Sequence, residues 1–374
     1  MTAYTEQQET TFYGEMQNCL GLDLRDSRGK IHDLSFVLLS LMISLLRNRD
    51  GNLSSIHRSM KNIHVELCSI LSIDIEHVIS RSHLPRLLKK VALKKFEELV
   101  YDWFKLELSA GEKKWFAGDG KDLRGSIIKG AKRGEVRVQL ISHEEKSVIG
   151  NSYYSGKKES EKPCLQELII EKKVSNQKIT SDALHLCPAM TEPIEAAKGV
   201  FLIGLKENQK ELLQDMKDHA SSFRAIRKYR SVDKGHGRLE ERFYELYDIS
   251  GEYFAPRWDK TNFRSLIIVD RERISLKDNS LQKERSYYIS NGQAENTNEY
   301  FKAIRNHWSV EVNHHIRDVT LREDSFRTKK NEVTRVFSGL RTLVLEILRL
   351  LKPKSIIAQI ELFQDNLKEL IRAL

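Results

Sequence analysis

Cysteine and proline are scarce in this chain of 374 residues, and it has no long apolar run. The four cysteines (Cys19, Cys68, Cys164 and Cys187) are scattered without a CxxC pair, so neither a disulfide framework nor a cysteine-rich zinc site is expected. Only 6 prolines and 19 glycines accompany 40% hydrophobic residues, which argues against a disordered chain. We therefore expect a globular protein with reduced cysteines that mostly serve packing.

The longest apolar run covers Leu34–Leu46 and has 13 residues. A membrane-spanning helix needs about 20, so this run predicts a buried helix instead. The first residues are acidic and polar, unlike a secretory signal peptide. The sequence thus predicts a cytoplasmic protein without a membrane partner.

Acidic residues are outnumbered by basic ones, with 53 Asp and Glu against 62 Lys and Arg, a net charge of +9 and a pI of about 9.1. This balance favours a polyanionic partner such as nucleic acid, although a merely basic soluble protein has the same composition.

Several common catalytic motifs are also missing. "GDGKDLRG" lacks the GxxxxGK[ST] spacing of a nucleotide-binding loop, and no HExxH occurs. His314 and His315, with His307 and Glu311, are spaced three to four residues apart on one helical face that could bind zinc, but no cysteine lies nearby. We interpret His307 and Trp308 as packing residues or DNA contacts.

The pattern of hydrophobic residues divides the chain into five parts. Residues 1–110 have helical periodicity and form a predicted N-terminal domain. Residues 111–206 begin with three short strand patterns and continue as helix, strand, helix, strand. Three antiparallel strands followed by such an alternation predict an α/β fold, a mixed sheet with helices on its faces.

Residues 207–296 are predicted to be a β-rich insertion, with 7 Lys and Arg against 3 acids between Ser221 and Arg242. Residues 297–352 are helical again, and residues 353–374 add a last amphipathic helix after Pro353. The leucine-rich C-terminal helices are either ordinary core or a dimer surface.

Three acids stand at positions that suggest a site. Asp119 is expected to close the first strand, although Asp-Gly is also a common hairpin turn. Asp182 is expected to close a later strand, where an N-cap is the alternative. Glu311 is expected at the edge of a helical apolar stripe, where it could instead be an ordinary boundary residue. That stripe comprises Ile304, Trp308, Val312, Ile316 and Val319.

Taken together, the acids favour a metal centre. Asp119 and Asp182 end strands that can lie side by side, and the Glu311 helix needs a sheet face to cover. Converging carboxylates repel and raise one another's pKa, a cost that divalent cations remove. Two Mg²⁺ ions about 4 Å apart can clamp the attacking and leaving oxygens of a phosphodiester. Lys121 and Arg124 would then hold the nucleic-acid backbone.

The motifs resemble those of DDE transposases from bacterial insertion sequences, in the subgroup that includes the H-repeat-associated proteins. In order, they are "FAGDGKDLRGS", "KITSDALH", "GVFLIGLKENQKELLQD", "GHGRLEER" and "RNHWSVEVNHHIRDVTLREDSFR". The N-terminal stretches "LDLRDSRGKIHDLSFVLLSLMISLL" and "SRSHLPRLLKKV" are similar to that subgroup's associated domain. The resemblance extends from about residue 20 to 352.

This resemblance implies a retroviral-integrase-like (RNase-H-like) catalytic fold with a β-strand insertion. It implies that Asp119, Asp182 and Glu311 bind Mg²⁺, with Mn²⁺ as a substitute. The reaction would be strand cleavage at transposon ends and strand transfer into target DNA, with a homodimer in the DNA complex and a nucleoid-associated location. Candidate DNA contacts are Lys121, Arg124, Arg238, Arg242, Arg305, His307, Trp308 and Arg327.

The chain departs from the family pattern after Glu311. Val312 stands where relatives have Asn, and Asp318 stands seven residues after the glutamate, where a Lys is expected. An alternative function therefore stays open, that of a catalytically inactive, transposase-derived DNA-binding protein.

Overall fold

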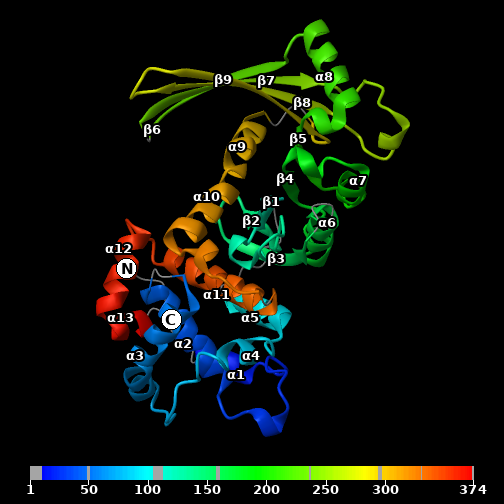
Figure 1. The fold of residues 1–374 in the computed structure, drawn as a ribbon. Helices are drawn as coiled ribbons and strands as arrows, with labels where there is room; N and C mark the ends of the chain where they lie inside the picture. Colours follow the sequence, from blue (N-terminus) through cyan, green and yellow to red (C-terminus); the bar gives the residue numbers. More distant parts are fainter. Residues whose placement is uncertain are drawn as a thin grey trace.

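The structure is a computed structural model that describes residues 11–48, 51–103, 113–156, 161–235, 237–293, 297–329 and 331–372. It divides into a helical body and a large mixed sheet with helices on its faces (Figure 1). This mixed α/β architecture confirms the predicted fold class at that level. None of the helices in these ranges has the length and apolar character that crossing a bilayer requires.

The helical body contains both ends of the described chain. Its N-terminal helices are α1 (Phe12–Asn18), α2 (Leu34–Arg47), α3 (Leu53–Leu71), α4 (Leu84–Leu88) and α5 (Leu93–Trp103), and its C-terminal helices are α11 (Asn331–Leu350), α12 (Ile356–Asp365) and α13 (Leu367–Arg372). Asp33 caps α2 by accepting a hydrogen bond from the Phe36 N–H at 2.7 Å. Helices α2 and α11 share one apolar core, so the buried helix predicted for Leu34–Leu46 is confirmed.

The first five strands form the predicted mixed sheet. They are β1 (Trp115–Asp122), β2 (Glu135–Ser142), β3 (Val148–Ser155), β4 (Lys178–Ser181) and β5 (Val200–Leu205). Strands β1, β2 and β3 are antiparallel neighbours, whereas β1, β4 and β5 run parallel. Helix α6 (Glu161–Glu171) connects β3 to β4, and helix α7 (Pro188–Ala196) connects β4 to β5. Parallel neighbours end at the same sheet edge, where side chains from successive strands can meet.

The chain between 207 and 296 extends this same sheet. Helix α8 (Lys210–Ser222) leads into β6 (Arg227–Gly235), β7 (Arg238–Asp248), β8 (Ser265–Ser275) and β9 (Leu281–Ser290). Because β9 pairs antiparallel with β5, the nine strands follow the order β3-β2-β1-β4-β5-β9-β8-β7-β6. The domain boundaries proposed from the sequence stay predictions.

The Glu311 region is less regular than the sequence predicts. Helix α9 (Thr297–His307) is followed by α10 (Ser309–His315) and a π-helical segment, Ile316–Thr320. The predicted stripe is confirmed at Ile304 and at the half-buried Ile316, which packs against the helical core. It is wrong at Trp308, Val312 and Val319, which are 41%, 50% and 51% exposed. The break at Trp308 and the wider π turn change the phase of the helix. The buried positions are instead Val310, Asn313, His314 and Arg317.

Candidate active site

Asp119 lies within β1 and not at its end. The ladder with β2 continues through Asp119↔Gln139 to Asp122, which excludes the hairpin turn considered from the sequence. On the other side, pairing with β4 stops at Gly118↔Ser181. The prediction that Asp119 closes its strand is therefore wrong for the β2 side and correct only for the β4 side. Beyond Gly118, the edge of β1 that faces β4 has no partner strand among the described residues.

Asp182 follows β4 directly and starts the 3-10 turn Ala183–His185. It occupies the N-cap position, but its carboxylate accepts no capping hydrogen bond within the described chain, so the N-cap alternative does not explain it. His307 Nε2 lies 3.8 Å from Asp182 Oδ1, and His307 Nδ1 lies 2.9 Å from the Thr180 hydroxyl oxygen. His307 thereby lowers the pKa of Asp182 against the opposing effect of burial.

The charge of Asp182 affects the ionisation of Asp119. Burial and the charge of Asp182 raise the pKa of Asp119 to about 7, whereas His307 opposes this rise. A carboxyl group with such a pKa is poorly solvated and lacks a full countercharge. The pair is therefore suited to a divalent cation, which would favour ionisation of both groups.

Glu311 reaches the site from α10. It is exposed and lines a cavity of about 210 Å³ that is also lined by Asp182, His307 and Trp308. Asp119 is not among the described residues that line this cavity. Helix α10 nevertheless contacts Asp119, because His314 Nδ1 lies 3.8 Å from Asp119 Oδ2. The structure thus brings Asp182 and Glu311 to one cavity and places Asp119 beside the same helix.

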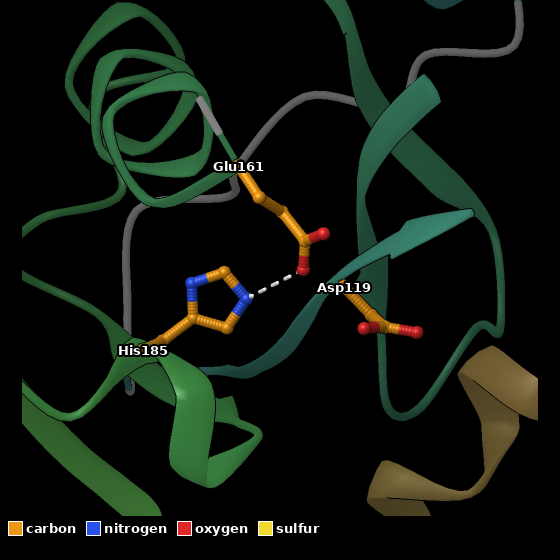
Figure 2. Close-up of side chains that lie close together, drawn as sticks. All are labelled: Asp119, Glu161 and His185. Carbon is orange, nitrogen blue, oxygen red and sulfur yellow. Dashed lines mark ion pairs between the residues drawn. The ribbon is translucent and has the colours of Figure 1, made fainter. Parts of the chain in front are cut away.

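Two further residues lie beside Asp119 that the sequence interpretation missed. Ligand atoms of Asp119, Glu161 and His185 all lie within 4.8 Å of one another, and Figure 2 shows Glu161 and His185 facing each other next to Asp119. Glu161 is the first residue of α6, and His185 ends the turn that follows Asp182. The signal for His185 was its place in "KITSDALH", three residues after Asp182. Glu161 carries no comparable signal.

The candidate DNA contacts Lys121, Arg124 and Arg327 differ in their ion pairs and in their exposure to solvent. Lys121 Nζ lies 2.7 Å from an Asp318 oxygen and 3.5 Å from an Asp324 oxygen. Arg124 projects outward with its side chain 74% exposed, and Arg327 is also exposed. All three assignments as DNA contacts stay predictions, with Arg124 and Arg327 the more accessible.

Two of the candidate contacts on the insertion and α9, Arg242 and Arg305, line the cavity. Arg242 is buried and ion-paired with Asp233 at 2.7 Å and with Glu240. Arg305 also approaches Asp233, at 3.2 Å, and it lines the cavity with Arg242. Arg238 lies 3.5 Å from Glu240 at the start of β7. The role of this charged cluster toward DNA stays a prediction.

The fold and the site define a class, namely α/β proteins in which neighbouring strands of a mixed sheet carry an acidic cluster suited to a divalent cation. Comparison with known proteins makes this class more specific. No protein-family model matches the chain. The chain is 28% identical to the Escherichia coli K12 protein named "Putative protein YbfL", over 71% of this chain and 72% of that one.

Two further relatives carry more informative names. The chain is 27% identical to the "H repeat-associated putative transposase YhhI" of Escherichia coli K12, over 71% of this chain and 72% of the relative. It is 24% identical to the "Putative transposase YncI" of Escherichia coli O157:H7, over 68% and 66%. These relatives confirm the resemblance to transposases that include H-repeat-associated proteins.

Proposed function

We propose that the chain is a DDE DNA transposase that cleaves DNA at transposon ends and joins those ends to target DNA in a divalent-metal-dependent reaction. One observation carries this proposal: Asp119 and Asp182 extend from adjacent parallel strands and are electrostatically coupled, while Glu311 lines a cavity with Asp182. The names of the relatives support a transposition enzyme. The strand order, and the position of Glu311 on helix α10 after the sheet is complete, are consistent with an RNase-H-like catalytic fold.

Asp119, Asp182 and Glu311 would hold the ions, Mg²⁺ or in its place Mn²⁺. When bound, such ions supply a metal-activated nucleophile and stabilise the charge on the leaving 3′-oxygen. The donor set fits, because carboxylate oxygens are the ligands that Mg²⁺ and Mn²⁺ prefer. His307 would orient Asp182, since its Nδ1 is fixed by Thr180 and its Nε2 faces the carboxylate.

The cationic residues would hold the phosphate backbone of double-stranded DNA, both the terminal repeats and the target. Arg124 and Arg327 are accessible for this, and the cavity offers Arg305 and the half-exposed Trp308. Phosphate contacts of this type fix the position of DNA without reading its sequence. A homodimer in the DNA complex and a nucleoid-associated, cytoplasmic location complete the proposal.

The test is strand cleavage of DNA that carries the element's own terminal repeats, with Mg²⁺ or Mn²⁺. Asp119→Asn should abolish cleavage while duplex binding, measured by gel shift, stays within about twofold. Asp122→Asn, on the same strand, is the matched control and should cut as wild type does. Cleavage by Asp119→Asn within a few-fold of wild type would reject the assignment. Salt-sensitive duplex binding without any cleavage by wild type would favour the inactive DNA-binding protein.

A further inference from the structure

We propose that Glu161 and His185 complete a divalent-cation site with Asp119, so that one metal position has two carboxylates and one imidazole as ligands. The inference rests on the proposed metal-dependent function and adds ligands to it. The chemistry of this donor set favours Mn²⁺ over Mg²⁺ at this position, because Mg²⁺ prefers oxygen ligands throughout whereas later divalent ions accept imidazole nitrogen more readily.

The distances are those of a ligand cluster. Protein–cation bonds measure about 2.0–2.6 Å, so two ligands on opposite sides of an ion are about 4–5 Å apart. The ligand atoms of Asp119, Glu161 and His185 lie within 4.8 Å of one another. Glu161 Oε1 and His185 Nε2 are 3.3 Å apart, close to the roughly 3 Å that separates adjacent octahedral ligands. Only small side-chain shifts would therefore enclose an ion.

His185 is buried, and the hydrogen-bonding capacity of its ring nitrogens is not fully used, as expected of a metal ligand without its metal. It is 0% exposed; its Nδ1 has no hydrogen-bond partner among the described residues, and its Nε2 approaches Glu161 Oε1 at 3.3 Å without good hydrogen-bond geometry. Burying an imidazole whose hydrogen-bonding capacity is only partly used is costly, because most buried polar groups are fully hydrogen-bonded. Its Nε2 faces Glu161 beside Asp119 (Figure 2). A bound cation would satisfy this nitrogen.

Neighbouring groups hold both new ligands in place. The Tyr154 hydroxyl donates a hydrogen bond to Glu161 Oε2 at 3.2 Å, which leaves Oε1 directed at His185. The Asn208 side-chain amide donates to the Ala183 carbonyl at 2.7 Å and so fixes the turn that carries His185. Such outer contacts are typical of metal ligands, whose orientation they fix.

The backbone of β1 also provides space for Glu161. A Cβ atom at Gly120 would lie 2.6 Å from Glu161 Cδ, so any other residue at this position would displace the glutamate. The edge of β1 past Gly118 has no β4 partner, which lets Glu161 and His185 approach Asp119 from that side. The Asp-Gly pair of "AGDGK" thus serves one cluster: the acid is a ligand and the glycine admits the second ligand.

The direct test is Mn²⁺ binding to the full chain, followed by electron paramagnetic resonance. Wild type should show ¹⁴N modulation from one imidazole on bound Mn²⁺, and Mg²⁺ should compete weakly. His185→Gln should remove the modulation, and both His185→Gln and Glu161→Gln should weaken Mn²⁺ binding at least about tenfold. Glu167→Gln, an exposed acid on the same helix, is the matched control and should bind Mn²⁺ as wild type does.

Circular dichroism melting would verify that each variant is folded. Wild-type Mn²⁺ affinity in folded Glu161→Gln and His185→Gln, or bound Mn²⁺ without nitrogen modulation in wild type, would overturn the inference. The proposed function would survive that result if Asp119→Asn still abolishes cleavage. Normal cleavage by Asp119→Asn would instead reject the function, whatever the ligands of Mn²⁺.

Discussion

At the scale of single residues, the site combines groups that are unfavourable without a cation. Asp119 is mostly buried beside Asp182, and its pKa is raised to about 7 by burial first and by that neighbour second. The strand register explains the proximity, because β1 and β4 are parallel and Ser181 pairs with Gly118, each immediately before its aspartate. Burying Asp119 beside Asp182 therefore costs folding free energy in the absence of a cation.

The pKa of Asp119 predicts how metal binding depends on pH. A ligand carboxyl must be ionised, so protons compete with the cation below the folded-state pKa of about 7. Mn²⁺ affinity should be constant above about pH 8 and should fall about tenfold per unit at pH values well below 7. Titration calorimetry at pH 8.0 and 5.5 measures this. Equal affinities at the two pH values would show that Asp119 is not a ligand or is not perturbed.

Two glycines of β1 give a matched pair of substitutions. Gly120→Ala places a Cβ 2.6 Å from Glu161 Cδ, and Gly118→Ala places one 2.7 Å from Leu165 Cδ1. Both should lower the unfolding free energy by about 1–3 kcal/mol through overpacking. Only Gly120→Ala should also weaken Mn²⁺ binding, because only it displaces a carboxylate. Denaturant unfolding and Mn²⁺ titration check this, and equal Mn²⁺ affinity in the two variants would contradict it.

The sequence allowed part of this site to be predicted. Asp119, Asp182 and Glu311 stand in motifs whose order along the chain pointed to them. Glu161 could not be found that way, because it is near Asp119 only through the packing of α6 against Gly118 and Gly120. That packing is a property of the tertiary structure and leaves no local pattern.

At the scale of secondary-structure elements, a buried charge cluster joins the sheet to the C-terminal helices. Glu323 is ion-paired with Arg137 of β2 at 2.9 Å and with Arg317 of the π-helical segment at 2.6 Å. Arg317 also donates to the Ser338 carbonyl of α11 at 2.7 Å. Against the effect of burial, Arg137 and Arg317, and to a lesser extent the buried Arg341 of α11, hold the pKa of Glu323 well below its usual value. One carboxylate therefore holds β2, the π segment and α11 together.

Removing that carboxylate charge should destabilise the protein strongly. Glu323→Gln leaves buried guanidinium groups uncompensated, which typically costs about 3–5 kcal/mol of unfolding free energy. Glu332→Gln is the matched control, because Glu332 lies on the exposed side of α11, 58% exposed and 3.7 Å from Lys89. It should change stability by less than about 1 kcal/mol. Chemical denaturation of both variants measures the difference, and similar values for the two would contradict a joining role for Glu323.

The elements that the sequence predicted poorly are those whose burial does not follow a simple period. Strand β6 is exposed along almost its whole length, so its residues show no alternation of apolar and polar groups. In α10 and the π segment, the buried side includes polar residues: His314 contacts Gln139, Arg317 pairs with Glu323, and the Asn313 amide has no hydrogen-bond partner among the described residues. By contrast, β2 and α2 have clear apolar patterns and were predicted correctly.

At the scale of the whole molecule, the two ends of the chain depend on one another. Helices α2 and α11 lie in the same helical body (Figure 1). Their residues belong to one apolar core, with Leu38, Leu41, Leu340 and Val344 fully buried. The predicted N-terminal domain is thus not packed independently of the C-terminal helices. Sequence periodicity predicted helices in both the N-terminal and the C-terminal part of the chain, but it contains no information on which distant helices share a core.

Removal of residues 1–110 should therefore destabilise the rest. The truncated chain would expose the apolar face of α11, which normally packs against α2 and α5. We expect it to bind the dye ANS and to lose cooperative thermal unfolding, with the full chain as the control. A monomeric truncated chain with a sharp melting transition would contradict the shared core.

The central claim is that acids from β1, from the end of β4 and from α10 hold divalent cations in one place. Anomalous diffraction from crystals of the full chain grown with Mn²⁺ tests it most directly. The account predicts a Mn²⁺ peak about 2.0–2.6 Å from carboxylate oxygens of Asp119. A second peak is expected between Asp182 and Glu311, within about 4 Å of the first. Fully occupied Mn²⁺ elsewhere, with none of these three acids as a ligand, would contradict it.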